Sequence, residues 1–358
     1  MRIIQIMPDF GLAGAEIMCE NLTVELTKAG HDVTVISMYD YHSAITERLE
    51  KLGIQIIYLH KKLGMDISMI SKMRKIFKEI NPDVIHTHRN CPQYAVPAAI
   101  MAGVKCRVHT VHNIADKENG KLARIANKFF FKYCHVIPVA LSELIKDTIL
   151  CEYRMRSDEI PIIFNGIDLS KCIIKNDYAI DDSFKILHIG RFSEQKNHIG
   201  LLKAFEQFYK NHPNSELWLI GDGEKKNEIE EYVKKSELSS SVKFIGLQNE
   251  VYAYLHDADI FTLPSNYEGI PMTLIEAMGT GVPIVATAVG GVPDMLTDGE
   301  DSLIVENDIE QIAKAFEVYY LNDKLRVEHG SKVRERAEAF SVETMTYRYM
   351  MIYKNNRS

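Results

Sequence analysis

The hydrophobic positions of the chain gather into short runs of strand length, separated by stretches in which apolar residues recur at helical spacing. Six such runs lie in the first half of the chain: RIIQIM, HDVTVIS, QIIYLH, DVIHTH, RVHTVH and HVIPVA. Six more lie in the second half: KILHIG, ELWLIG, VKFIG, DIFTLP, VPIVAT and DSLIVE. Strongly apolar strands that alternate with helices are typical of α/β domains built on a parallel sheet. The pattern therefore predicts two doubly wound domains in tandem.

A turn dipeptide, Asn165-Gly166, follows the last run of the first half, and the next residues to about Ser183 offer little apolar surface. A length of 358 residues also agrees with two domains of roughly 150 residues each. By analogy with similar folds, we expect the Met- and Tyr-rich final helix to cross back onto the first domain. We thus expect an N-terminal domain, a linker, a C-terminal domain and a returning helix, over residues 1–168, 169–184, 185–340 and 341–358.

The composition excludes several classes of protein. With 46% hydrophobic and 25% charged residues, the chain is an ordinary globular protein and is neither disordered nor collagen-like. The six cysteines form no CxxC pair, which argues against a zinc knuckle and a redox motif. The first apolar run is too short for a signal peptide, and no stretch approaches the roughly 20 apolar residues of a membrane span. We therefore expect a cytoplasmic protein.

The net charge of −7 is unevenly distributed. Residues 1–171 hold 22 Lys and Arg against 19 Asp and Glu, whereas the remainder holds 20 against 30. No nucleic-acid-binding signature accompanies the basic half, so we expect no nucleic-acid partner. A peripheral contact with an anionic membrane stays open, because segments 66–80 and 121–133 each combine an apolar face with several basic residues. The alternative is that both helices pack on the sheet and expose only their charges.

The run from Ser265 to Thr287, SNYEGIPMTLIEAMGTGVPIVAT, contains the most informative pattern. A strand ends at Pro264, and Pro271 stands where a helix would start, a position at which its missing N–H costs nothing. The first amides of such a helix have no intrahelical partner and can bind a diphosphate. These are the amides of Met272, Thr273 and Leu274. Two carboxylates, Glu268 and Glu276, flank the expected anion site.

A second pattern, HIGRFSEQKN, follows the first strand of the C-terminal domain. Gly190 and Arg191 come directly after the strand, and Lys196 opens the next helix. We expect the two cations to meet at the carboxyl end of the strand. Two positive charges there suit the negative charge that builds on a departing nucleoside diphosphate.

Together, these two runs resemble the E-x7-E motif and the G-R-x4-K element of the family-four retaining GT-B glycosyltransferases. The resemblance covers nearly the full chain and implies two Rossmann-like domains that face each other across a cleft. It further implies that Glu268 binds hydroxyls of the donor sugar and that Glu276 binds the nucleotide ribose. Arg191 and Lys196 would bind the pyrophosphate. One departure is Pro271, where many members have Gly.

The same resemblance extends to weaker matches. FGLAGAEIM places Gly14 in the loop where the backbone could approach the acceptor or the leaving phosphate, although Ala13 stands where the family usually has Gly. RVHTVHN assigns His112 to a hydroxyl of the donor sugar, and VKFIGL places Leu247 where the family uses a backbone group against the base. The runs FNGID, GDGE and GGVPDML also fit the family. His86 and His88 share one side of their strand, and we expect them to be structural or to line the acceptor site.

The implied activity is retaining, metal-independent transfer of a hexose or N-acetylhexosamine from a nucleotide diphosphate sugar, with UDP as the expected nucleotide. The acceptor would be a saccharide or a lipid-linked saccharide of polysaccharide biosynthesis, such as capsule or exopolysaccharide. No cofactor or metal is implied, and the catalytic residues would be Glu268, His112, Arg191 and Lys196. Two alternatives stay open: a sugar-nucleotide 2-epimerase on the same fold, and a non-catalytic protein that binds nucleotide sugars.

Overall fold

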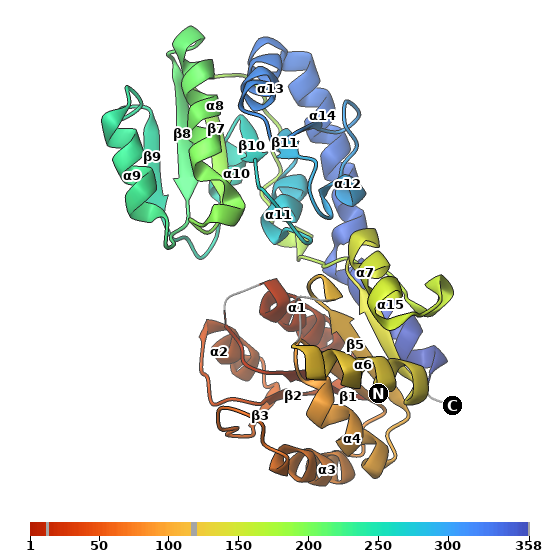
Figure 1. Cartoon of the computed structure of the whole chain (residues 1–358). Helices are drawn as coiled ribbons and strands as arrows, with labels where there is room; N and C mark the ends of the chain where they lie inside the picture. Colours follow the sequence, from red (N-terminus) through yellow and green to blue (C-terminus); the bar gives the residue numbers. More distant parts are fainter. Residues whose placement is uncertain (12–13, 116–119, 357–358) are drawn as a thin grey trace. The chain divides into compact units, whose positions relative to one another are not determined.

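A computed structural model of the chain describes residues 1–11, 14–115 and 120–356, so Ala13 lies outside the described residues. The chain divides into two compact domains, which Figure 1 shows as separate sets of strands and helices. Residues Met1–Ile167 and Ser341–Ser358 form the N-terminal domain, and Asp168–Phe340 form the C-terminal domain. Each domain contains a six-stranded sheet, and all strand pairs are parallel. The prediction of two doubly wound α/β domains is confirmed.

The N-terminal sheet has the strand order β3-β2-β1-β4-β5-β6, the doubly wound order in which the first strand lies at the centre. Its strands are β1 (Arg2–Met7), β2 (Asp32–Ser37), β3 (Gln55–Tyr58), β4 (Val84–His88), β5 (Cys106–Val111) and β6 (Val136–Ala140). Its helices are α1 (Gly14–Lys28), α2 (Ala44–Lys51), α3 (Ser68–Ile80), α4 (Pro92–Ala102), α6 (Lys121–Tyr133), α7 (Glu143–Tyr153) and α15 (Val342–Asn355).

Alternate residues of β1 show how this sheet is covered on both faces. Ile3 packs in a core cluster with apolar residues of α1 and α15, whereas Ile4 and Ile6 pack with residues of α3 and α4. Successive side chains of a strand point to opposite faces, so a strand in the middle of a three-layer domain must be apolar on both. This explains why the first run of the sequence is almost continuously hydrophobic.

The C-terminal sheet has the order β12-β11-β10-β7-β8-β9, which is the same doubly wound order. Its strands are β7 (Phe184–Ile189), β8 (Ser215–Ile220), β9 (Val242–Gly246), β10 (Ile260–Leu263), β11 (Ile284–Thr287) and β12 (Leu303–Val305). Its helices are α8 (His198–Asn211), α9 (Lys226–Lys235), α10 (Tyr252–Asp257), α11 (Met272–Thr280), α12 (Val292–Met295), α13 (Ile309–Leu321) and α14 (Asp323–Arg336). Among the described residues, no helix has the length and apolar character needed to cross a bilayer.

The segment expected to link the domains, 169–184, is part of the C-terminal domain in the structure. Leu169 and Cys172 are buried, and both lie so close to Gly279 of α11 that a side chain there would meet them. The segment therefore packs on its own domain, although its sequence shows no helical or strand periodicity. At the other end, Val342 of α15 donates a backbone hydrogen bond to Ile167 and joins the core of the N-terminal domain.

Candidate functional site

Two loops of the C-terminal domain meet because their strands are neighbours. Strands β7 and β10 pair in parallel, so their carboxyl ends lie at the same edge of the sheet. The amide of Asn266 donates to the carbonyl of Gln195 at 2.8 Å, and the side chain of Asn197 donates to the carbonyl of Pro264 at 3.2 Å. These bonds hold together two sequence patterns that are about 70 residues apart. Ligands of doubly wound sheets bind at this edge.

The side chains of Lys196 and Glu268 form an ion pair where these loops meet. Lys196 Nζ lies 2.6 Å from Glu268 Oε1, and the exposed fractions of the two side chains are 14% and 4%. Ser265 Oγ donates to the same carboxylate oxygen at 2.5 Å, and Gln195 Nε2 donates to the other at 3.3 Å. A buried carboxylate is stable only when a positive charge and hydrogen-bond donors compensate its desolvation. The surrounding loops supply both.

Glycines provide the space that this pair needs. A Cβ on Gly190 would lie 3.1 Å from the Lys196 methylenes, so a side chain there would displace the lysine. A Cβ on Gly290 would lie 1.8 Å from the carbonyl oxygen of Glu268, and the backbone of Gly290 has a φ of +59°. The amide of Gly291 also donates to the carbonyl of Gly269 at 3.0 Å. The GGVPDML run therefore supports the loop that carries Glu268.

Helix α11 begins one residue later than predicted. Pro271 is extended, with φ −73° and ψ 117°, and Met272 is the first helical residue. We expected three unpaired amides, but the amide of Leu274 donates to the carbonyl of Pro271 at 3.1 Å, because the first turn is tightened by an i to i−3 bond. Among the described residues, the amides of Met272 and Thr273 have no hydrogen-bond acceptor. The buried Thr273 hydroxyl also lacks a partner there.

The carboxylate of Glu276 lies in the second turn of α11. Burial raises its pKa to about 7, and among the described residues no donor or cation is paired with this carboxylate. Burial raises the pKa of the Tyr252 phenol in α10, and the nearby negative charge of Glu276 raises it further. Among the described residues, Glu276 is thus an acceptor without a donor, and it lies in the helix whose first two amides are unpaired.

The structure pairs Arg191 and Lys196 with different carboxylates. The Arg191 side chain is 75% exposed, and its Nε lies 3.3 Å from Glu224 Oε2 in the GDGE turn. Such an exposed ion pair contributes little to stability, so the guanidinium can exchange Glu224 for another anion at low cost. Leu247, which follows β9, is also exposed.

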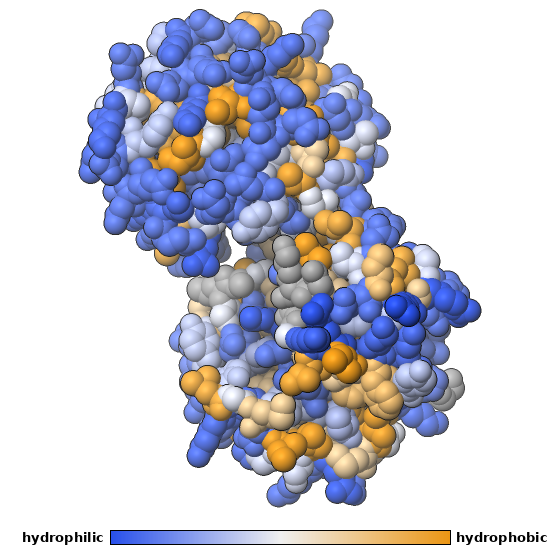
Figure 2. All heavy atoms as spheres, in the orientation of Figure 1, coloured by the Kyte–Doolittle hydropathy of each residue, from blue (hydrophilic) through white to orange (hydrophobic). Residues whose placement is uncertain are grey.

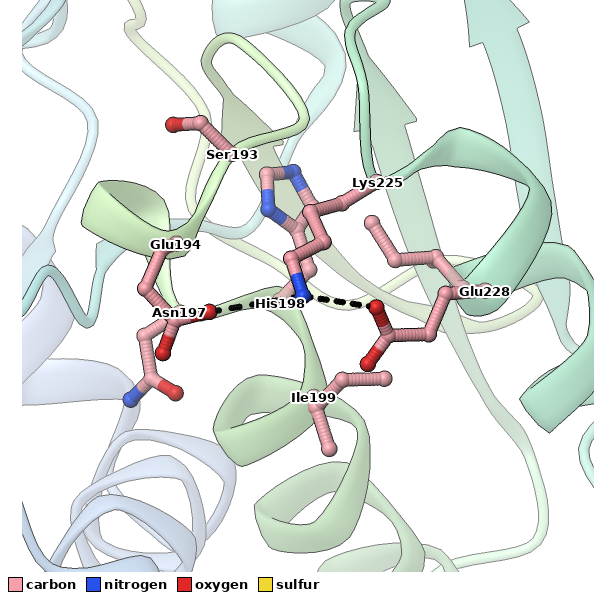
Figure 3. A pocket seen from close by; sticks show the side chains of 8 residues that line it. Ser193, Glu194, Asn197, His198, Ile199, Lys225 and Glu228 are labelled. Carbon is pink, nitrogen blue, oxygen red and sulfur yellow. Dashed lines mark hydrogen bonds and ion pairs between the residues drawn. The ribbon is translucent and has the colours of Figure 1, made fainter.

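Behind the Lys196 loop lies a small polar hollow of about 50 Å³, shown in Figure 3. Lys225 Nζ lies 2.8 Å from Glu228 of α9 and 3.6 Å from Glu194 of the loop. These ion pairs connect the loop to α9. The hollow is far below the 300 Å³ or more of a typical ligand pocket, so it supports the loop and does not receive a ligand of nucleotide size.

A chain of imidazoles, of which His88 is fully buried, ends at the carboxyl edge of the N-terminal sheet. His88 Nε2 lies 3.0 Å from Gln5 Oε1, and His88 Nδ1 lies 2.9 Å from His112 Nε2. Burial lowers the pKa of His112 to about 3, and it also lowers the pKa of His88, so both rings are neutral. With Gln5 Oε1 as acceptor, His88 donates from Nε2 and accepts at Nδ1 from His112 Nε2–H. His112 therefore carries its unprotonated nitrogen at Nδ1.

His86 is structural. Its Nδ1 lies 2.7 Å from the hydroxyl of Tyr353, and its Nε2 lies 2.7 Å from Thr110 Oγ1, which in turn lies 2.7 Å from the hydroxyl of Tyr349. Both tyrosines belong to α15. These bonds attach the last helix to the first sheet.

One charged pair at this edge was missed by the sequence analysis. Arg89 directly follows β4, and its guanidinium lies 2.5 Å from the buried carboxylate of Glu16 in α1. Arg89 has a φ of +50°, and its charge is among the causes that lower the pKa of His112. Gly14, two residues before Glu16, is the first residue of α1. The position of Arg89 directly after an apolar strand is a signal for a functional residue. The sequence gives no sign of its pairing with Glu16, which lies 73 residues away.

Two protein-family models match the chain. The model described as Glycosyltransferase Family 4 matches residues 12–171, and the model described as Glycosyl transferases group 1 matches residues 171–336. Each model therefore covers approximately one of the two domains, and together they cover the loops with Lys196, Glu268 and His112.

Several characterised and uncharacterised proteins have similar sequences. An uncharacterized glycosyltransferase of Methanocaldococcus jannaschii is 26% identical over 236 residues, which are 60% of this chain and 58% of the relative. The UDP-Gal:alpha-D-GlcNAc-diphosphoundecaprenol alpha-1,3-galactosyltransferase of Escherichia coli is 29% identical over 73% of this chain and 72% of the relative. The N-acetyl-alpha-D-glucosaminyl L-malate synthase of Bacillus anthracis is 27% identical over 96% and 94%.

Solved structures share the fold across nearly the whole chain. A glycosyltransferase from Rickettsia africae superposes with a TM-score of 0.86 at 19% identity, covering 99% of this chain and 98% of that one. Anabaena HepE in complex with UDP-glucose superposes with a TM-score of 0.83 at 19% identity, covering 99% and 100%. The chain belongs to the group 1 and family 4 glycosyltransferases, and its two Rossmann-like domains have the GT-B fold.

Proposed function

We propose that the protein is a retaining glycosyltransferase that moves a hexose or N-acetylhexosamine from a UDP-sugar to a saccharide or lipid-linked saccharide. The E. coli relative is named for a UDP-galactose donor and a diphosphoundecaprenol-linked acceptor, which supports this choice of donor and acceptor class. The B. anthracis relative is named for a malate product, so the acceptor varies among similar chains. The proposed biological setting is the assembly of a capsule or another exopolysaccharide.

The observation that carries the proposal is the buried pair of Lys196 and Glu268 beside the start of α11. Without donor, the two charges neutralise each other. When the donor binds, its diphosphate takes the ammonium of Lys196 and its sugar hydroxyls donate to Glu268. The amides of Met272 and Thr273 provide further donors for the phosphates. Donor binding therefore replaces the ion pair of Lys196 and Glu268 with two contacts to the donor. Lys196 contacts the diphosphate and Glu268 contacts the sugar, on either side of the bond that breaks.

Glu276 and Arg191 complete the proposed donor site. The ribose hydroxyls supply the donors that the Glu276 carboxylate lacks, and their hydrogen bonds favour its ionised form. Arg191 leaves its exposed partner Glu224 and adds a second positive charge to the diphosphate. In the N-terminal domain, His112, which contacts His88 through Nε2, receives a hydrogen bond from a hydroxyl of the donor sugar.

In the proposed reaction, the acceptor oxygen bonds to the anomeric carbon on the same face from which the diphosphate leaves. The bond from this carbon to the phosphate oxygen breaks, and that oxygen takes the proton of the acceptor hydroxyl. Lys196, Arg191 and the α11 amides stabilise the charge that develops on the leaving group. Because these groups supply the positive charge, we propose that transfer needs no divalent ion.

The test is incubation with a panel of nucleotide sugars, with and without candidate acceptors, while diphosphate release is measured. We expect a UDP-sugar to release its diphosphate only when an acceptor is present. Proton NMR should show that donor and product have the same anomeric configuration. Activity should stay complete in excess chelator. An inverted product refutes the retaining mechanism, and activity that requires a divalent ion refutes metal independence. A new sugar nucleotide formed from donor alone indicates the epimerase, and binding without turnover indicates the non-catalytic alternative.

A further inference from the structure

Helix α6 exposes the face that a helix on a sheet normally buries. Its buried side chains are Asn127, Phe130 and Phe131. Its other large apolar residues form an exposed stripe at helical spacing, with exposed fractions of 54–75%, and Phe129 and Tyr133 contact each other with ring centroids 5.4 Å apart. The stripe consists of Leu122, Ile125, Phe129 and Tyr133. A helix that only covered a sheet would place such residues inward.

Helix α3 shows the ordinary arrangement in the same domain. Met69, Met73 and Phe77 of α3 are buried, whereas its basic residues point outward. The alternative in which both basic amphipathic segments pack their apolar face on the sheet therefore holds for α3 and does not hold for α6. The difference lies in Phe130 and Phe131, which supply α6 with a second apolar face and allow the stripe to remain outside.

Basic residues accompany the stripe along its whole length. Each stripe residue directly follows a Lys or Arg, and α6 contains no acidic residue. Of these cations, Arg124 pairs with Glu152 at 3.2 Å. The other three cations are Lys121, Lys128 and Lys132. None of them forms an ion pair with a residue that the structure describes.

The apolar surface continues beyond the stripe. Ile100 and Met101, at the end of α4, have exposed fractions of 46% and 47%, and α4 contacts α6. Figure 2 shows hydrophobic residues gathered over α6 and α4 on the visible face of this domain. A contiguous apolar surface with a basic border is uncommon on a soluble protein and marks an interaction site.

We propose that the stripe and its lysines dock the N-terminal domain on an anionic lipid surface, with α6 lying in the plane of the headgroups. Aromatic and aliphatic side chains on one face and lysines beside them are the features of interfacial helices. The charges select this occupant over a second copy of the chain, because two identical basic faces would repel each other. The proposal concerns binding alone and does not depend on the transfer reaction. If the proposed function also holds, docking brings the enzyme to a membrane-embedded acceptor.

The experiment is co-sedimentation of the full chain with phosphatidylcholine vesicles and with vesicles that contain phosphatidylglycerol, at low and high salt. We expect binding to the anionic vesicles that weakens as salt increases. No nucleotide sugar is present, so failure of this proposal and failure of the proposed function are distinguishable. Equal binding to both vesicle types, or no binding at low salt, overturns the proposal.

Two double variants separate the apolar and charged contributions. Leu122→Ser with Phe129→Ser should weaken binding to anionic vesicles at least tenfold, because it removes the apolar face. Its control changes two equally exposed residues of the C-terminal domain, Leu321→Ser with Val327→Ser. All four side chains are exposed, so neither variant opens a core.

For the charges, Lys121→Gln with Lys132→Gln should weaken binding about 30-fold. The control is Lys203→Gln with Lys210→Gln on α8, which removes the same charge elsewhere. Equal losses for test and control variants overturn the proposal. A concentration-dependent dimer in sedimentation velocity that the Leu122 and Phe129 changes dissociate also overturns it, since the stripe would then bind a second copy.

Discussion

Replacement of Glu276 by Gln should make the protein more stable and a poorer nucleotide binder. Burial raises the pKa of this carboxyl from an ordinary value near 4.5 to about 7. The folded state therefore holds a proton that the unfolded state releases between these two pH values. Above pH 7, folding must bury the charge without a compensating donor. Gln keeps the shape and removes this cost.

The pKa difference gives the size and pH range of the effect. About 2.5 pH units at 1.36 kcal/mol each correspond to at most about 3 kcal/mol. Below pH 4.5 the carboxyl is protonated in both states, and the stability associated with this proton is fully present. As pH rises from 4.5 to 7, the wild type loses that stability and the variant does not. Glu276→Gln should thus equal the wild type near pH 4.5 and exceed it by at most about 3 kcal/mol at pH 8.

Urea unfolding followed by tryptophan fluorescence measures this difference in the relevant domain, because the single tryptophan, Trp218, lies on β8 of the C-terminal domain. Glu230→Gln, on α9, is the matched control and should show no comparable gain. UDP affinity of Glu276→Gln should fall, since an amide cannot accept from both ribose hydroxyls. A stability gap that does not change with pH, or a variant less stable than wild type at pH 8, would refute the reasoning.

Three further substitutions test the contacts of the site. Lys196→Met should destabilise the C-terminal domain by about 3–5 kcal/mol in the same unfolding assay, because it leaves the carboxylate of Glu268 buried without a cation. It should also abolish transfer. Gly290→Ala should destabilise by at least about 2 kcal/mol and weaken UDP binding measured by calorimetry, because the new Cβ overlaps the Glu268 carbonyl. His88→Leu should lower kcat/KM about tenfold, because His112 loses the acceptor that fixes its tautomer.

Each of these substitutions has an informative control. Glu268→Gln added to Lys196→Met should restore stability but not transfer, because the unpaired charge disappears while the donor site stays incomplete. Gly299→Ala shares a positive φ of +69° but has open space around its Cβ, so it should cost less than Gly290→Ala. His88→Gln should recover part of the activity, since its amide oxygen can accept from His112. Equal effects of test and control would contradict the assigned contacts.

The sequence predicted the strands and their loops well, because nearly continuous apolar runs can only be buried on both faces of a sheet. It also indicated Lys196, Glu268 and Glu276 as a group. It did not indicate that Lys196 and Glu268 form an ion pair, since that depends on how the two loops after β7 and β10 fold against each other and place their side chains. Contacts between distant segments were missed for the same reason, as with Arg89 and Glu16.

The outward stripe of α6 shows a different limit. Hydrophobic spacing identifies a helical face but not what covers it, and α6 has two apolar faces. The structure buries the one with Phe130 and leaves the one with Phe129 exposed. Periodicity alone therefore left open whether the stripe of four residues packs on the sheet or faces outward.

The attachment of α15 to His86 and Thr110 has a consequence for synthesis on the ribosome. The core of the N-terminal domain contains Tyr349 and Tyr353, which are translated only after the whole of residues 168–340. The nascent N-terminal domain therefore cannot complete its core until the C-terminal domain has been synthesised. Until then, the hydrophobic face that α15 covers stays exposed and His86 lacks its tyrosine partner. The C-terminal domain is continuous in sequence and can complete its fold first. Chaperones that bind exposed apolar surface would then encounter the first half of this chain for longer than the second.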